Sequence, residues 1–186
     1  MVVQIIRVLT SIRQRDRPAS SMGLILSRSF GSLLMATHAL MILPAPEEGW
    51  SGRHVANVIL RIVCPESLPW VAACDVDLTG SVRNALGVAA KELRVFQASD
   101  LLHALPASDQ VVWASWFFFS AAKDAETIRP HESYVESARK SELVVRVVDA
   151  GYVYVAGPVG LAQSWRSSFQ NATIEVVDLS ESHFPE

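Results

Sequence analysis

The chain has 186 residues, of which 50% are hydrophobic and 19% are charged, so it is long enough and apolar enough to bury one globular core. Its charges are unevenly distributed: residues 1–46 hold five Arg and one Asp, whereas residues 47–186 hold eleven basic and eighteen acidic residues. An acidic body disfavours direct nucleic-acid binding through phosphate contacts and allows a basic protein partner.

Residues 1–46 are interpreted as a basic and apolar N-terminal extension. Residues 1–21 contain four arginines among aliphatic residues, a pattern compatible with a basic amphipathic helix. Residues 22–43 are rich in Leu, Met, Ile and Ala, but Arg28 and His38 interrupt them. Because a membrane-spanning helix needs about 20 mostly apolar residues, the sequence predicts no stable membrane span.

Three readings of this extension stay open. It can be an export signal, although Leu43-Pro44-Ala45-Pro46 is a poor cleavage site, or an Arg-rich, acid-poor presequence for an organelle. It can also lack a targeting role, either as an unstructured segment upstream of a later start at Met22 or Met35 or as a helix packed on the body. The last group is favoured. It predicts a cytoplasmic protein with one ordered domain, residues 47–186, and a linker over residues 44–49.

The first half of the body predicts two strands and two helices. Val55–Val63 and Trp70–Leu78 each alternate in polarity and therefore predict half-buried strands. The residues expected on one face of the second strand are Trp70, Ala72, Cys74, Val76 and Leu78. A helix is expected to begin at about Ser81, whose hydroxyl can cap it, and a short helix over residues 100–105 ends at Pro106. The residues at helical spacing after Ser81 are Val82, Ala85, Ala89, Leu93 and Phe96.

In the second half, Val111–Phe119 is apolar on both faces, which predicts a central strand covered on each side. Ser133-Tyr134-Val135-Glu136 matches a capping box and predicts a helix to about Lys140. Leu143–Asp149 and Tyr152–Ala156 are joined by Ala150-Gly151, so we expect a hairpin in which Gly151 has a positive φ.

A last helix and a last strand complete the expected fold. Leu161, Trp165 and Phe169 lie on one helical face, and Thr173–Asp178 predicts a strand. The sequence therefore predicts an α+β fold: a mixed, mostly antiparallel sheet with helices packed on it, ending in a β-hairpin followed by a helix and a strand.

Cys64 and Cys74 are too few for a disulfide framework and lack the spacing of a zinc site. We expect both thiols to be reduced and largely buried. The five histidines are scattered, so the sequence predicts no metal site and no cofactor apart from the alternative described next.

The sharpest candidate for chemistry is Asp75-Val76-Asp77-Leu78-Thr79. Alternate residues of a strand share a face, so both carboxylates can reach one phosphate and one metal ion. The motif resembles the first motif of haloacid-dehalogenase-type phosphatases. This resemblance implies that Asp75 is the nucleophile, Asp77 the acid and base, and Mg²⁺ the cofactor. That family usually places the motif on the first strand of a parallel sheet, whereas here a strand precedes it. Two acids on the wet face of a strand are therefore the favoured interpretation.

Val153–Gly160 reads as a strand followed by a glycine turn and a helix. It resembles the nucleotide-binding turn near the end of ferredoxin-reductase-like domains, where a helix N-terminus and glycine amides approach a phosphate. No G-x-G-x-x-G accompanies the turn, so a strand joined to its packing helix is the favoured interpretation.

From Val111 to the end, the chain resembles a family of small uncharacterised bacterial proteins classed as a domain of unknown function. The resemblance rests on the aromatic strand, on HESYVESARKSELVVRVVDAGYVYV and on the terminal IEVVDLSE. The resemblance implies a bacterial, intracellular α+β protein and does not indicate any particular activity.

These observations favour a non-enzymatic protein that acts through protein contacts, in one specific form an immunity-type or inhibitor protein for a basic toxin or effector. The residues expected in its acidic docking patch are Glu132, Glu136, Glu142 and Glu175. The alternative is a Mg²⁺-dependent phosphohydrolase centred on Asp75 and Asp77. The identity of the partner or substrate and the oligomeric state stay open.

Overall fold

The computed structural model describes residues 37–81 and 86–179. The expected helix over residues 1–21, the apolar stretch up to residue 36 and the targeting alternatives fall outside these ranges. No helix within them is long and apolar enough to cross a bilayer.

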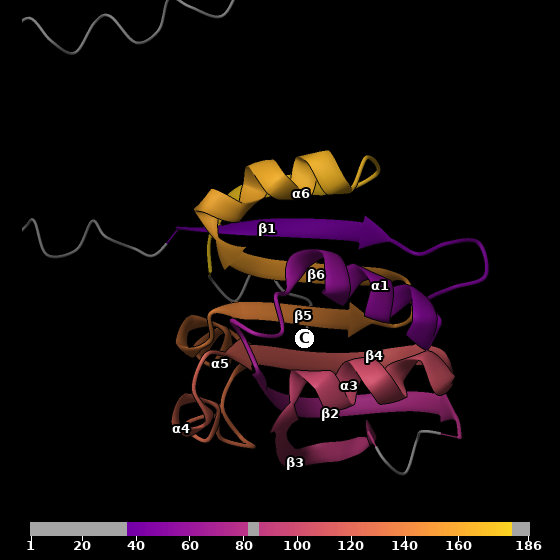
Figure 1. The fold of residues 1–186 in the computed structure, drawn as a ribbon, viewed down its shortest axis with the longest axis vertical. Coiled ribbons are helices and arrows are strands. Elements are labelled where there is room, and N and C mark those ends of the chain that lie inside the picture. The colour runs from indigo at the N-terminus through magenta and orange to yellow at the C-terminus, as the bar shows by residue number, and fades with distance from the viewer. Residues whose placement is uncertain (1–36, 82–85, 180–186) are drawn as a thin grey trace, which may run out of the picture. The chain divides into compact units, whose positions relative to one another are not determined.

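Seven strands form one sheet in the order β3-β2-β4-β5-β6-β1-β7, and every neighbouring pair is antiparallel (Figure 1). The strands are β1 (Thr37–Pro44), β2 (Trp70–Gly80), β3 (Val88–Gln97), β4 (Ser108–Phe119), β5 (Leu143–Val148), β6 (Tyr152–Pro158) and β7 (Thr173–Asp178). The predicted α+β fold is confirmed, with pairing that is antiparallel throughout the described sheet.

Helices pack on both faces of this sheet. They are α1 (Gly52–Ile62), α3 (Ala98–Ala104), α4 (Ala122–Ala125), α5 (Tyr134–Lys140) and α6 (Ala162–Ser168), with 3-10 turns η1 (Leu105–Ala107) and η2 (Val159–Leu161). Helices α1, α3 and α6 share a core with what we call the first face, and α4 and α5 share a core with the opposite, second face. In Figure 1, α1 and α3 lie in front of the strands and α4 and α5 lie at their left-hand end.

Strand β4 is the centre of both cores. Trp116 and Phe118 are buried on the first face, and Phe117 and Phe119 are buried on the second. Each of these four buried aromatic side chains removes a large apolar area from water, so β4 contributes strongly to the stability of the fold. The prediction of a central strand covered on both sides is confirmed.

Strand β1 lies inside the segment expected to be an extension. It pairs with β6 on one side and β7 on the other, and it buries Ala39 and Met41 on the first face and Leu40 on the second. The sheet therefore begins before the boundary expected after residue 46. Residues 44–49, expected to link the extension to the ordered domain, connect β1 to α1 within the fold. Hydropathy alone does not distinguish a short buried strand from the apolar region of a signal peptide.

The strand expected at Val55–Val63 is wrong, because these residues belong to helix α1. The Ser51 side chain accepts a hydrogen bond from the backbone N–H of His54 at 3.3 Å and caps the helix. Val55 and Ile59 are buried one turn apart, whereas Leu60 is 56% exposed. In residues 55–63 the apolar side chains fit both the helical and the strand periodicity. Packing against η1 and β4 favours the helix.

The helix expected after Ser81 is wrong over residues 88–97, which form the edge strand β3. Leu93 pairs with Cys74 and Phe96 pairs with Val71 of β2. Leu93 packs with the second-face core and Phe96 with the first-face core, so the apolar residues alternate in the strand. The expected helical positions within residues 82–85 lie outside the described part of the chain.

The hairpin between β5 and β6 is confirmed, but the residues that make its turn differ from those expected. Asp149 and Ala150 both have φ of 49°, and the N–H of Gly151 donates to the carbonyl of Val148 at 3.0 Å. Two central residues of positive φ make a type I′ turn, whose twist matches that of the strands. The positive φ expected at Gly151 is therefore wrong.

Candidate functional site

Helices α4 and α5 cover only one end of the second face. Their neighbours in its core include Ala72, Phe117, Val144 and Ala156, which lie in register across four strands. Beyond this row, the strands present two further rows on the same face. We call these two rows the open half of the second face. Tyr134 of α5 contacts Arg146 in the first row, and Ser115, Arg146 and Val148 are buried.

The first row of the open half is polar. Its members are Cys74, Ser115, Arg146 and Tyr154, and each is paired with the next across strands β2, β4, β5 and β6. Arg146 is only 8% exposed, and its guanidinium lies 4.3 Å from the centre of the Tyr134 ring. This cation–π contact offsets part of the cost of burying the charge.

The phenols around Arg146 are held in their neutral form. Burial raises the pKa of Tyr134, against the opposing effect of the Arg146 charge. Burial, followed by the neighbouring Tyr152, also raises the pKa of Tyr154. Sequence reasoning missed this row. The signal that could have found it is the single charge in the otherwise apolar strand Val144-Val145-Arg146-Val147-Val148.

The Cys74 thiol is also protonated at neutral pH. Burial, followed by the nearby carboxylates of Asp75 and Glu132, raises its pKa to about 11 from a usual value of 9.0. Cys64 is exposed and donates to a carboxylate oxygen of Glu66 at 3.0 Å, so the expectation that both cysteines are largely buried is wrong for Cys64. The two thiols are not joined in a disulfide.

Alkylation should distinguish these two thiols. A pKa near 11 gives Cys74 about a hundredfold less thiolate at pH 8 than a thiol with the usual value of 9.0, so iodoacetamide should modify Cys64 well before Cys74. Mass spectrometry of quenched samples measures both rates. A Cys64→Ser variant serves as the control and should show only the slow reaction. Equal rates at the two positions would contradict the burial of Cys74.

The second row of the open half is more exposed. Its members are Asp77, Trp113, Val148 and Tyr152, the last paired with Val148. Tyr152 is 49% exposed and Trp113 is partly buried. The rings of Tyr152 and Tyr154 lie 6.2 Å apart, centre to centre. The row therefore presents aromatic surface beside a carboxylate.

A bulge in β2 sets the position of the predicted acidic motif. Asp75 has φ of 50°, and the registers with β3 and β4 both shift at this residue. The shift places Val71 and Ala73 on the same first face as Val76 and Leu78. The single face expected for alternate residues from Trp70 to Leu78 is therefore wrong, because one extra residue reverses the alternation.

Asp75, Asp77 and Thr79 are all exposed on an antiparallel strand. The Thr79 hydroxyl donates to the Gln110 carbonyl at 3.4 Å. The described residues contain no group of three or more His, Cys, Asp or Glu side chains that could hold a metal ion. The sheet differs from the parallel one that the phosphatase resemblance implies.

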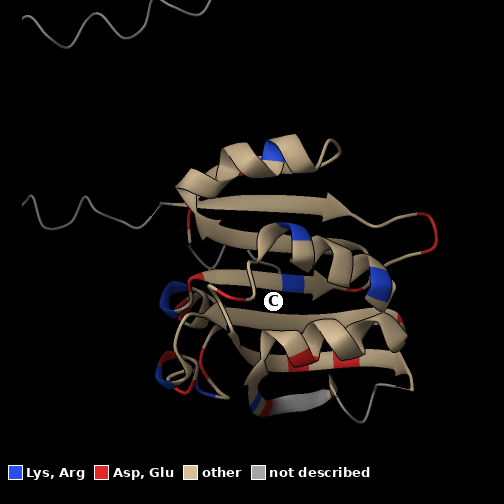
Figure 2. Ribbon diagram, in the orientation of Figure 1, with Lys and Arg blue, Asp and Glu red and all other residues tan. Residues whose placement is uncertain are grey.

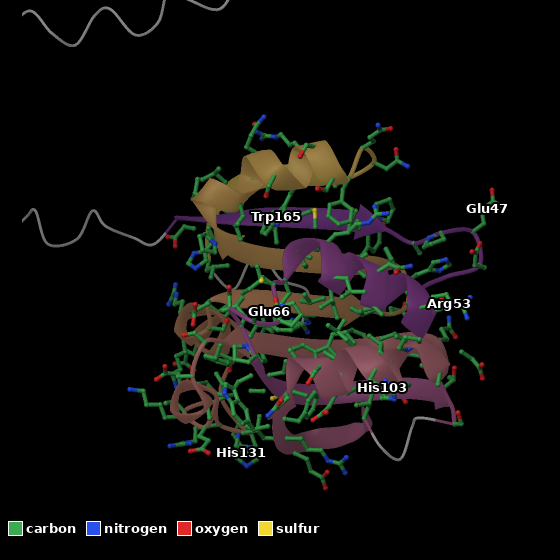
Figure 3. The ribbon with its side chains drawn as sticks, viewed as in Figure 1. Glu47, Arg53, Glu66, His103, His131 and Trp165 are labelled. Atoms are coloured by element: carbon green, nitrogen blue, oxygen red, sulfur yellow. The ribbon has the colours of Figure 1, made fainter. Side chains whose placement is uncertain are left out.

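Carboxylates gather at one end of the sheet, beside the second row. We call the set the acidic rim; its members are Glu47, Glu48, Asp77, Asp109 and Asp149, all exposed. Backbone hydrogen bonds tie the loops together there: Ala150 N–H donates to the Val112 carbonyl at 2.9 Å, and Ala45 N–H donates to the Gly151 carbonyl at 2.8 Å. Figure 2 shows the β1–α1 connection in red at this right-hand end, and Figure 3 labels Glu47 and Arg53 there.

The four glutamates expected to form a docking patch are Glu132, Glu136, Glu142 and Glu175. Three have local structural roles: the first forms an ion pair with Lys140, the second completes the capping box with Ser133, and the third accepts from the backbone N–H of Ser120 at 2.7 Å. The fourth is exposed on the edge strand β7. They do not form one free acidic patch, whereas the capping box itself is confirmed.

The first glycine of the predicted turn has a packing role. Gly157 lies within β6, and a Cβ there would lie 2.8 Å from Leu143 Cδ1 and 3.5 Å from the Trp165 ring of α6, so the glycine leaves room for these side chains. Trp165 of α6 is 1% exposed, as the predicted apolar helical face requires. The expected order of strand, turn and packing helix is confirmed.

Comparison with family models, curated proteins and solved structures finds none that matches this chain. The resemblance of the segment from Val111 onward to bacterial proteins of unknown function therefore stays a prediction.

Proposed function

We propose that this protein is a non-catalytic binding protein that captures a basic partner protein through the open half of the second face and the acidic rim. An immunity-type or inhibitor protein for a basic toxin or effector is the specific form of this proposal. The observation that carries it is the combination of partly exposed aromatic side chains with five exposed carboxylates at one end of one sheet.

The aromatic side chains would supply the binding energy. Tyr and Trp are enriched at protein interfaces because they bury large areas at a small cost in conformational entropy. Trp113 projects from β4, and Tyr152 and Tyr154 project from β6, which is separated from β4 by β5. A partner can therefore bury them without ordering a loop.

The acidic rim would supply orientation and speed of association. Exposed charges add little to affinity, but a surface of one sign raises the association rate with a partner of opposite sign, most strongly at low salt. Arg53 is a basic residue at this end, and the imidazole of His54 lies 3.6 Å from the Glu48 carboxylate. These two side chains are fewer than the five carboxylates of the rim. The rim therefore stays predominantly acidic.

Charge reversal tests this function. The full-length chain immobilised as bait should capture a basic protein from its source cells, and the partner identified by mass spectrometry is then purified. At 50 mM salt, the rim variant Asp77→Lys/Asp149→Lys should associate with it at least about tenfold more slowly, and the difference should shrink at 500 mM salt. Tyr152→Ala should instead raise the dissociation rate.

The matched control is Asp124→Lys/Glu126→Lys on and beside α4, which makes the same charge change at exposed positions away from the rim. It should associate at nearly the wild-type rate. An acidic partner, or equal slowing by both double variants, would overturn the proposal. Mg²⁺-dependent turnover of p-nitrophenyl phosphate that Asp75→Asn abolishes would instead support the alternative phosphohydrolase.

A further inference from the structure

A groove with different chemistry lies among the elements that cover the first face. It is lined by residues 43–46, which end β1 and follow it, by residues 167–171 at the end of α6, and by Arg61 near the end of α1, and its volume is about 570 Å³. Sites for small ligands usually have volumes of about 300–1,000 Å³. The groove is therefore large enough for a small organic molecule.

Arg61 is the charged member of this lining, and no carboxylate accompanies it among the lining residues. Its guanidinium lies 5.7 Å from the centre of the Phe169 ring, and Nη1 donates to the Ser168 carbonyl at 3.5 Å. A guanidinium carries five N–H donors, and this hydrogen bond uses one of them. The ring and the carbonyl hold the cation in place and leave donors for a ligand.

We propose that this groove binds a small carboxylic acid with an apolar body. The planar guanidinium of Arg61 matches a carboxylate, which can accept two parallel hydrogen bonds. Leu43, Pro44 and Phe169 offer apolar surface for the body of the ligand, and Asn171 offers a side-chain amide. The groove differs in chemistry from the proposed protein-binding surface, whose rim residue Glu47 directly follows Pro46 of the groove lining.

The apolar part of the lining favours a carboxylic acid with an apolar body over inorganic phosphate. Phosphate carries nearly two negative charges at neutral pH, and Arg61 is the one cation among the lining residues to offset the cost of dehydrating them. The groove is open and Arg61 is exposed, so solvent and salt weaken the attraction. The affinity is therefore expected to depend on the ligand burying its apolar body as well as on its charge.

The test uses 3-phenylpropionate as the probe, with 3-phenylpropanamide and inorganic phosphate as comparisons. Titration of the full-length ¹⁵N-labelled chain at pH 7, followed by NMR chemical shifts, gives each dissociation constant. Wild type should bind 3-phenylpropionate saturably, with shifts at the backbone N–H groups of Leu43, Ala45 and residues 167–171. The amide and phosphate should bind at least about tenfold more weakly.

Helix α1 provides a matched pair of variants, because Arg53 and Arg61 are both exposed on it. Arg61→Gln should weaken 3-phenylpropionate binding at least about tenfold, whereas Arg53→Gln should leave it unchanged. Circular dichroism checks that both variants fold as wild type does. Absence of saturable binding to wild type, equal binding by Arg61→Gln, or tighter binding of the amide or of phosphate would each overturn the proposal.

Discussion

Gly52→Ala is expected to destabilise the protein by about 3 kcal/mol or more. A Cβ at Gly52 would lie 1.9 Å from the carbonyl oxygen of Leu105 and 2.8 Å from Cβ of Ser108. The nearer atom belongs to the backbone of η1, so no rotation of a side chain relieves the contact. Helix α1 would have to move away from η1, and the buried contacts of Val55 and Ile59 would be lost with it.

The matched control for this substitution is Gly160→Ala, because no heavy atom lies within 4 Å of the Cβ that it would add. Its effect should lie between neutral and a stabilisation of about 1 kcal/mol, through reduced freedom of the unfolded chain. Urea denaturation followed by circular dichroism gives both free energies of unfolding. A Gly52→Ala variant as stable as Gly160→Ala would contradict the close packing of α1 on η1.

Phe118→Ala is expected to lower the free energy of unfolding by about 3–5 kcal/mol. Phe118 is fully buried on the first face of β4, paired with Val71 of β2 and Leu143 of β5. Strands on both sides fix its surroundings, so the cavity left by the ring cannot close by moving one edge of the sheet. A loss of this size approaches the lower end of the roughly 5–15 kcal/mol by which native domains are stable.

The control for Phe118 is Val176→Ala on the edge strand β7, where the side chain is 56% exposed. Its effect should stay within about 0.5 kcal/mol. The same urea experiment, with the slope of the transition compared between variants, separates lost stability from a changed unfolded state. Similar losses at the two positions would mean that β4 is not the centre of the core.

Several elements could be predicted because their signals are local. The doubly apolar Val111–Phe119 can only be stable where both faces are covered, and it forms the central strand. The Ser133 and Glu136 side chains satisfy backbone groups three residues apart, which needs no tertiary partner. The pattern of two strands separated by a short turn likewise predicted the β5–β6 hairpin.

The errors occurred where local signals conflict. Residues 52–62 and 88–97 contain apolar residues at both helical and strand spacing, and their neighbours decide between them. Residues 37–44 are a short apolar run whose role depends on distant strands β6 and β7. The bulge at Asp75 changed which residues of β2 share a face. The surrounding sequence contains no signal for this one extra residue.

The sequence by itself determined the α+β class, the central strand, the capping box and the acidity of the body, because composition and short-range periodicity are sufficient for these. Only the tertiary structure decided that Cys74, Ser115, Arg146 and Tyr154 form one row, and that the acidic rim lies beside aromatic side chains. The physical reason is that antiparallel register brings together residues far apart in sequence, and register is set by the packing of the whole sheet.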